Sequence, residues 1–159
     1  MTACERNKIR GEKLKYNLEK QGATHVNVML EDAGSLSDFF SFDKILLDAP
    51  CSGSGTDNVF KCNFTKELID KSKRAQERLL RKALKILKPG GEMVYSTCSI
   101  LREENEEILE RVLKNSNFRL LPINLGEEIG CLPSKMGETK VVAPSELFEG
   151  FFVGRIKKM

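Results

Sequence analysis

The spacing of hydrophobic residues predicts helices that alternate with strands over residues 6–115. Hydrophobic positions recur at helical intervals among lysines, arginines and glutamates in three segments, which are residues 6–21, 65–87 and 103–115. Short hydrophobic runs predict strands at residues 25–30, 44–47 and 93–95. Gly22 ends the first helix, and the KPGG sequence at residues 88–91 predicts a sharp turn after the second.

The pattern changes after residue 117. Residues 118–121 and 150–156 (GFFVGRI) are predicted strands, and the long segment between them contains Gly, Pro and Ser without a helical period. Two consecutive strands that are joined without a crossover helix pair antiparallel. The whole pattern therefore predicts an α/β fold with a mostly parallel sheet and a C-terminal antiparallel hairpin.

Length and composition predict one small domain. The 159 residues are enough for a single hydrophobic core. No apolar run approaches the roughly 18 residues of a membrane span, and the start lacks the basic and apolar regions of a signal peptide. We therefore expect a soluble, cytoplasmic protein without a membrane partner. The net charge of +3 favours a polyanionic partner only weakly.

The number and spacing of the cysteines predict that their thiols are reduced. There are five, scattered along the chain without a CxxC pair: Cys4, Cys51, Cys62, Cys98 and Cys131. This arrangement argues against both a zinc site and a disulfide framework, so no bound metal is expected. The only histidine, His25, lies in a predicted strand. Cysteine hydrolases need an imidazole to activate the thiol, which argues against that class of enzyme.

Residues that follow predicted strands are candidates for a functional site, because ligands bind outside the carboxyl ends of strands in open α/β sheets. This rule selects Cys4, Glu5, Asp32, residues 48–51 and residues 97–99. Each has a purely structural explanation as well. Cysteine is often a small buried residue, aspartate often caps a helix or forms a turn, and Glu5 fits the first turn of a helix.

Two cysteine motifs resemble those of a known family. DAPCSGSG (residues 48–55) and YSTCS (residues 95–99) are separated by a long amphipathic helix and KPGG. In this order and context they resemble motifs of the Nop/Sun family of RNA cytosine-5 methyltransferases. The family pattern is matched further by Glu5 with Arg10 and Asn17, by Asp32 in LEDA, and by EGFFVGRIKK at residues 149–158. The resemblance covers nearly the whole chain and implies a Rossmann-like class I methyltransferase sheet.

The resemblance implies transfer of a methyl group to carbon 5 of cytosine in RNA, with ribosomal RNA preferred to transfer RNA. Carbon 5 is a poor nucleophile until a thiolate adds to carbon 6 of the ring. By the family pattern Cys98 is the attacking thiol, Cys51 assists the release of the enzyme, and Asp48 stabilises the adduct by a hydrogen bond or proton. The neighbouring residues expected to bind the base are Pro50, Thr97 and Ser99. DNA cytosine methyltransferases attack with a Pro-Cys thiol, so Cys51 as the nucleophile is the chemical alternative.

The resemblance also implies S-adenosylmethionine as the methyl donor. A carboxylate at the end of the second strand accepts hydrogen bonds from ribose hydroxyls in nucleotide-binding α/β folds. Glu5 fits this role, and Arg10 orients it. Asp32 is expected beside the adenine, and Asp48 near the place where donor and base meet.

The chain departs from the family pattern at its start. The family's first strand and a glycine-rich loop resembling AAPGGK should precede the second strand, whereas this chain begins with MTACE. We therefore expect residues 1–159 to be a partial methyltransferase catalytic domain that lacks its N-terminal part, supplied by a missing segment or a partner chain. Two alternatives stay open: a non-catalytic RNA-binding remnant or scaffold, and a methyltransferase of the same fold that acts on a small molecule or protein.

Overall fold

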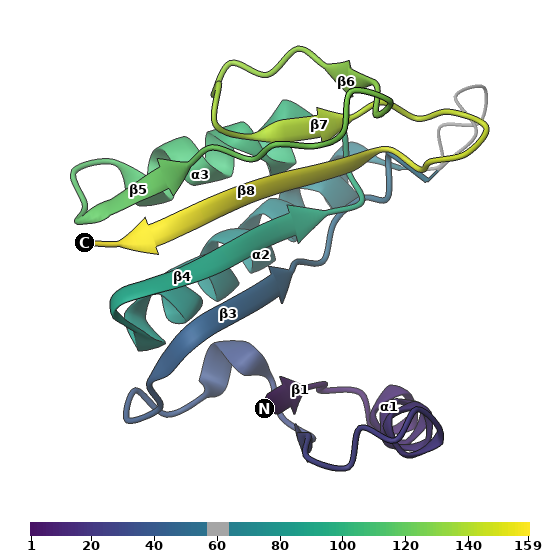
Figure 1. Cartoon of the computed structure of the whole chain (residues 1–159), viewed down its shortest axis with the longest axis vertical. Helices are drawn as coiled ribbons and strands as arrows, with labels where there is room; N and C mark the ends of the chain where they lie inside the picture. The colour runs from purple at the N-terminus through teal and green to yellow at the C-terminus, as the bar shows by residue number, and fades with distance from the viewer. Residues whose placement is uncertain (57–63) are drawn as a thin grey trace. The chain divides into compact units, whose positions relative to one another are not determined.

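The computed structural model describes residues 1–56 and 64–159, which form two compact units, Met1–Phe40 and Ser41–Met159 (Figure 1). Each unit has its own sheet. Cys62 lies outside the described residues. Within the ranges that are described, no helix combines the length and apolar character needed to cross a membrane.

The first unit contains a two-stranded parallel sheet. Its elements are β1 (Thr2–Cys4), α1 (Lys8–Lys20), β2 (Asn27–Met29) and the 3-10 turn η1 (Ala33–Ser35). The helix begins at Asn7, whose side chain accepts a hydrogen bond from the backbone N of Arg10 and so satisfies one amide of the first turn. The helix predicted at residues 6–21 and the strand predicted at residues 25–30 are confirmed.

The second unit contains a six-stranded sheet and two α-helices. Its elements are β3 (Phe42–Asp48), α2 (Lys66–Ile86), β4 (Leu87–Thr97), η2 (Arg102–Glu104), α3 (Glu106–Leu113), β5 (Phe118–Leu121), β6 (Cys131–Leu132), β7 (Lys140–Val142) and β8 (Phe151–Lys158). The order is β3-β4-β8-β7-β6, and β5 also pairs with β8. β3 and β4 are parallel, whereas β8 is antiparallel to β4, β5 and β7. Four strands therefore share one direction, which confirms the predicted α/β fold and its antiparallel C-terminal pairing (Figure 1).

The hydrophobic core of the second unit lies between the sheet and its two helices. Leu80 of α2 and Ile108 of α3 are fully buried against the sheet. Tyr95 of β4 and Phe152 of β8 are also fully buried, with their rings edge to face at a centroid distance of 6.1 Å. This geometry is the one that aromatic quadrupoles favour, and it joins the parallel and antiparallel parts of the sheet.

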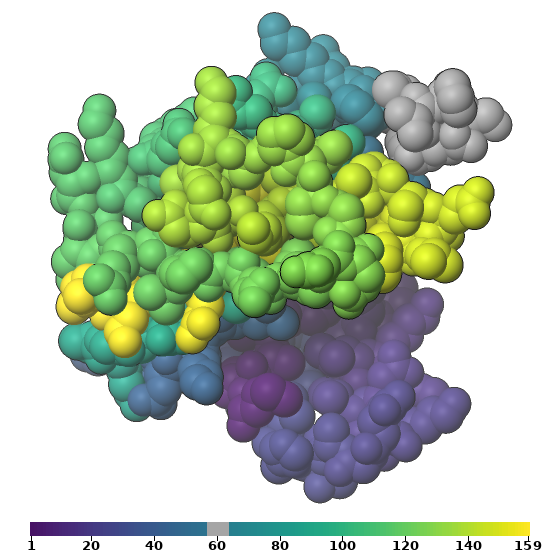
Figure 2. All heavy atoms as spheres, turned by 45° about the horizontal axis from the view of Figure 1, so that its top comes forward, coloured from purple at the N-terminus to yellow at the C-terminus, as the bar shows by residue number. Residues whose placement is uncertain are grey.

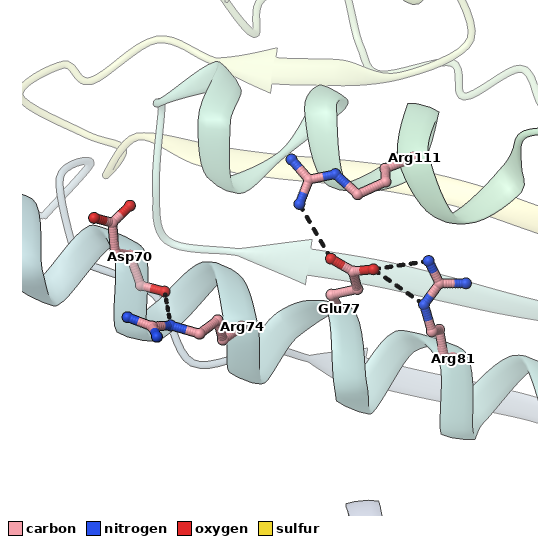
Figure 3. Close-up of polar contacts among 5 residues, drawn as sticks. All are labelled: Asp70, Arg74, Glu77, Arg81 and Arg111. Atoms are coloured by element: carbon pink, nitrogen blue, oxygen red, sulfur yellow. Dashed lines mark hydrogen bonds and ion pairs between the residues drawn. The ribbon is translucent and has the colours of Figure 1, made fainter.

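An ion-pair network links α2 and α3 on the side away from the core (Figure 3). Glu77 accepts from Arg81 at 2.7 Å and from Arg111 at 3.1 Å, and the two guanidinium groups lower the pKa of its carboxyl. A shallow hollow of about 380 Å³ beside this network is lined by Asp70, Lys73, Arg74, Glu77 and Arg111. Neither Cys51 nor Cys98 lines this hollow.

The segment between β5 and β8 contains no helix and carries the short strands β6 and β7. In the space-filling view this segment, coloured light green to yellow, spreads over one face of the second unit (Figure 2). The absence of a crossover helix is the reason that β8 returns antiparallel beside β4, as the sequence predicts.

Two predicted details differ from the structure. KPGG was expected to form a turn, but it lies inside β4, where the pairing of β3 and β4 shifts register between Phe42 and Lys44. Gly90 has a φ of +75°, and a Cβ at Gly91 would collide with the carbonyl oxygens of Lys88 and Asp43, so this irregular part of the strand requires glycine. The helix predicted at residues 103–115 is divided into η2 and α3 at Asn105, which is fully buried.

Candidate active site

The two cysteine motifs meet at the carboxyl ends of two neighbouring parallel strands. Asp48 pairs with Ser96 in the register of β3 and β4, so the loops that follow both strands leave the sheet side by side. The Sγ atoms of Cys51 and Cys98 are 3.1 Å apart, and both cysteines are half-buried. The structure thus brings together two thiols that are 47 residues apart in the sequence.

A set of short contacts holds the two loops against each other. The hydroxyls of Ser54 and Ser99 are 2.9 Å apart, and Gly55 N donates to the carbonyl oxygen of Cys98 at 2.9 Å. A Cβ at Gly55 would collide with the carbonyl oxygens of Cys98 and Gly150. Only glycine therefore permits this approach of the Cys51 loop to the Cys98 turn.

Glu104 and Asn105 were not predicted as site residues, yet both are fully buried beside the thiols. The Glu104 carboxylate accepts from Ser52 N at 2.8 Å and from Ser52 Oγ at 2.5 Å. Asn105 accepts from Thr97 Oγ1 at 2.6 Å and donates to the carbonyl oxygen of Ser99 at 2.8 Å. The sequence held one signal for Glu104, because it shares the spacing of four residues with Ile108 and Val112 on the apolar face of the predicted helix.

Asp48 and the predicted base-binding residues Pro50, Thr97 and Ser99 all form hydrogen bonds within the protein. Asp48 is exposed and accepts from Ser96 Oγ at 2.9 Å. The carbonyl oxygen of Pro50 accepts from Nε2 of the buried Gln76 at 2.8 Å, which leaves it one further lone pair. The hydroxyls of Thr97 and Ser99 are fully buried, and both hold the Cys98 turn in place.

The thiol of Cys51 is difficult to ionise. Burial and the hydrogen bond to Cys98 raise the pKa of Cys51 from its ordinary 9.0 to about 12. The negative charge of Glu104 contributes in the same direction. Cys51 is therefore a protonated thiol near neutral pH, able to donate its S–H to the sulfur of Cys98.

Two of the three acids predicted for the methyl donor, Glu5 and Asp32, lie in the first unit, where β1 and β2 run parallel. Glu5 Oε1 accepts from Asn7 N at 2.7 Å and from Arg10 Nη2 at 2.9 Å, and these bonds lower the pKa of the Glu5 carboxyl. Asp32 caps η1 by accepting from Gly34 N at 2.8 Å. Arg10 thus holds the Glu5 carboxyl, and the lowered pKa keeps this carboxyl ionised near neutral pH.

Comparison with known proteins identifies the family. The model of the family described as 16S rRNA methyltransferase RsmB/F matches residues 1–157. The chain belongs to the RsmB/F family. This membership confirms the predicted relationship to the Nop/Sun RNA cytosine-5 methyltransferases. In the described part of this RsmB/F chain, no group of three or more His, Cys, Asp or Glu residues is arranged to hold a metal ion.

Relatives of this RsmB/F chain include methyltransferases of two RNA classes. Ribosomal RNA small subunit methyltransferase F of Aeromonas salmonicida is 35% identical, over 99% of this chain and 35% of the relative. The tRNA (cytosine(72)-C(5))-methyltransferase of Pyrococcus horikoshii is 31% identical, over 99% of this chain and 40% of the relative.

A solved structure supports the fold. The crystal structure of NSun6 from Pyrococcus horikoshii with SFG matches with a TM-score of 0.88 and 30% identity, over 99% of this chain and 41% of that one. The RsmB/F chain spans 35% and 40% of the lengths of the two relatives above.

Proposed function

We propose that this chain takes part in the S-adenosylmethionine-dependent methylation of carbon 5 of cytosine in RNA, with ribosomal RNA as the preferred substrate. One observation carries the proposal. Two thiols lie 3.1 Å apart at the carboxyl ends of β3 and β4, which also carry the exposed carboxylate of Asp48, and the pKa of one of these thiols, Cys51, is raised. Family membership and the relatives that act on ribosomal RNA favour the same substrate class.

The raised pKa of Cys51 supports separate roles for the two thiols. Cys98 adds as thiolate to carbon 6 of cytosine, which makes carbon 5 nucleophilic. Asp48 stabilises the adduct by a hydrogen bond to the cytosine ring. After carbon 5 has been methylated and has lost its proton to a base, the bond between carbon 6 and Cys98 breaks. Cys51, protonated because of its raised pKa, then donates its S–H to the departing Cys98 sulfur.

The chain's acidic residues have the chemistry that the methyl donor requires. S-adenosylmethionine supplies an electrophilic methyl group on a sulfonium. The ionised carboxylate of Glu5, held by Arg10, suits ribose hydroxyls, and Asp32 suits the amino group of adenine. We propose that residues 1–159 form part of a methyltransferase catalytic domain.

A covalent trap tests the roles of the thiols. RNA that contains 5-fluorocytidine cannot lose its carbon 5 substituent as a proton, so an attacked base stays attached to the enzyme. We expect the 159-residue chain to form a denaturant-resistant adduct with such RNA in the presence of S-adenosylmethionine. Cys98→Ala should abolish the adduct, and Cys51→Ala should allow adducts to accumulate even on ordinary RNA.

Each outcome of this experiment is informative. An adduct that survives in Cys98→Ala and disappears in Cys51→Ala would reverse the assignment of the two thiols. RNA binding without any adduct or any binding of S-adenosylmethionine would favour the non-catalytic alternative. Transcripts of small-subunit ribosomal RNA and of transfer RNA, tested side by side, identify the preferred substrate.

A further inference from the structure

Two adjacent buried residues at the end of η2 each hold one of the cysteine loops. Glu104 and Asn105 are both 0% exposed. Glu104 binds the residue that follows Cys51, and Asn105 binds both neighbours of Cys98. We propose that Glu104 is a positioning residue that holds the Cys51 thiol at the Cys98 thiol. The inference rests on the proposed function, to which it adds a residue that does not touch the substrate.

The contact between Glu104 and Ser52 is specific to a carboxylate. Ser52 donates twice, from its backbone N at 2.8 Å and from its Oγ at 2.5 Å, and the two bonds go to different oxygens of Glu104. A carboxylate accepts at both oxygens and so matches the two donors of Ser52. Hydrogen bonds to a charged acceptor are also stronger than those between neutral groups. A glutamine would place an N–H against one of these donors and would lose at least one bond.

The Glu104 backbone is itself fixed. The buried hydroxyl of Tyr95, on β4, donates to the carbonyl oxygen of Glu104 at 2.9 Å. Asn105, the next residue, is tied to Thr97 and Ser99 on either side of Cys98. A single peptide unit therefore connects the loop of Cys51 to the turn of Cys98, in addition to the contacts that Ser54 and Gly55 make with that turn. Of these contacts, the one between Glu104 and Ser52 acts on the residue next to Cys51.

Glu106 offers a matched control for substitution of Glu104. It lies two residues further along, is 1% exposed, and its Oε1 accepts from Ser134 Oγ at 3.0 Å. Its Oε2 is buried without a hydrogen-bond partner among the described residues. Glu106→Gln therefore makes the same chemical change at the same depth without touching the Cys51 loop.

The first measurement needs no catalysis. Diamide takes two electrons and two protons from a pair of neighbouring thiols and leaves a disulfide, so its rate reports how closely Cys51 and Cys98 are held. Peptide mapping under non-reducing conditions identifies the Cys51–Cys98 product. Loss of the Glu104 charge alone would lower the pKa of Cys51 and speed the reaction, so a slower reaction reports the loss of positioning. We expect Glu104→Gln to slow this reaction by about tenfold or more, equivalent to about 1.4 kcal/mol. Glu106→Gln should leave the rate unchanged.

Further variants keep the test decisive if Glu104→Gln folds poorly by circular dichroism. Ser52→Ala removes only the hydroxyl bond, and it should slow the reaction in the same direction by a smaller factor. The double variant Ser52→Ala/Glu104→Gln should be no slower than Glu104→Gln alone, because both changes break the same contact. Wild-type rates in folded Glu104→Gln or Ser52→Ala, or no Cys51–Cys98 disulfide in the wild-type chain, would overturn the inference.

The RNA adduct separates this inference from the proposed function. If Glu104 positions Cys51, Glu104→Gln should form adducts with 5-fluorocytidine RNA and accumulate them on ordinary RNA, as expected for Cys51→Ala. Accumulation in Cys51→Ala but not in Glu104→Gln would contradict the positioning role alone. Slower disulfide formation in Glu104→Gln, with no RNA adduct in any variant, would support the positioning of the thiol and contradict the proposed function.

Discussion

The pKa of Cys51 leads to a prediction about its reactivity. Iodoacetamide reacts with the thiolate, and a rise in pKa from 9.0 to about 12 lowers the thiolate fraction of Cys51 near neutral pH by about a thousandfold. A more basic thiolate is also more nucleophilic, which recovers part of this loss. With the usual Brønsted slope of about 0.4–0.5, we expect Cys51 to be alkylated about 30- to 60-fold more slowly than an ordinary thiol.

The pH profile separates acidity from simple shielding. Shielding slows alkylation equally at every pH, whereas a raised pKa moves the plateau of the rate to higher pH. We expect the rate at Cys51 in the folded chain to rise about tenfold per pH unit up to about pH 10.5, while in urea it levels off near pH 9. Mass spectrometry of tryptic peptides measures both rates, and the exposed Cys131 serves as the internal standard.

One result would refute this reasoning. A rate at Cys51 in the folded chain that levels off near its plateau in urea would show that the thiol is neither desolvated nor bonded to Cys98. The variant Cys98→Ala tests the two causes separately. It removes the hydrogen bond but leaves most of the burial, so we expect the plateau of Cys51 to move only part of the way back.

The structure makes further predictions about stability and ligand binding. Because the pKa of Cys51 is raised, the protonated thiol stabilises the fold fully below its unfolded pKa of 9.0, and this stabilisation is lost as the pH rises toward 12. Urea titrations across that range should show a decline in the free energy of unfolding, and Cys51→Ala should reduce this decline. Phe152→Ala should lower the free energy of unfolding in urea by about 3–5 kcal/mol because Phe152 is fully buried, whereas Phe39→Ala, at a side chain that is 99% exposed, should have no measurable effect. Glu5→Ala should weaken S-adenosylmethionine binding in calorimetric titration while the exposed Glu12→Ala leaves it unchanged, and equal affinities would exclude Glu5 from the donor site.

Much of the fold could be predicted because its elements have simple patterns. α2 has a regular hydrophobic stripe, and the helix is found within one residue of the prediction at each end. The strand at residues 150–156 was predicted from its composition, and its antiparallel direction from the lack of a crossover helix. KPGG was mistaken for a turn because proline and glycine usually interrupt a strand. A register shift inside a parallel pair depends on the partner strand and has no signal in the residues themselves.

The sequence predicted those site residues that directly follow a strand. Cys51 and Cys98 were selected by that rule and by resemblance, and the structure places them in contact. Glu104 belongs to a run of glutamates at the start of the predicted helix, and such a run usually faces solvent. Its burial depends on Ser52, a residue 52 positions away that supplies both donors. Contacts of this kind arise from the packing of two loops, which a linear pattern does not describe.

The position of β8 has a consequence for how the second unit forms. β8 follows β4, β5 and β7 along the chain, yet it pairs with all three and lies between β4 and the other two. During synthesis on the ribosome, the earlier strands emerge with open edges that cannot pair with one another in the final order. Closure of the sheet is therefore a late event that waits for β8 to leave the exit tunnel. A nascent chain stalled before Phe151 would hold two separate pieces of sheet for a chaperone to protect.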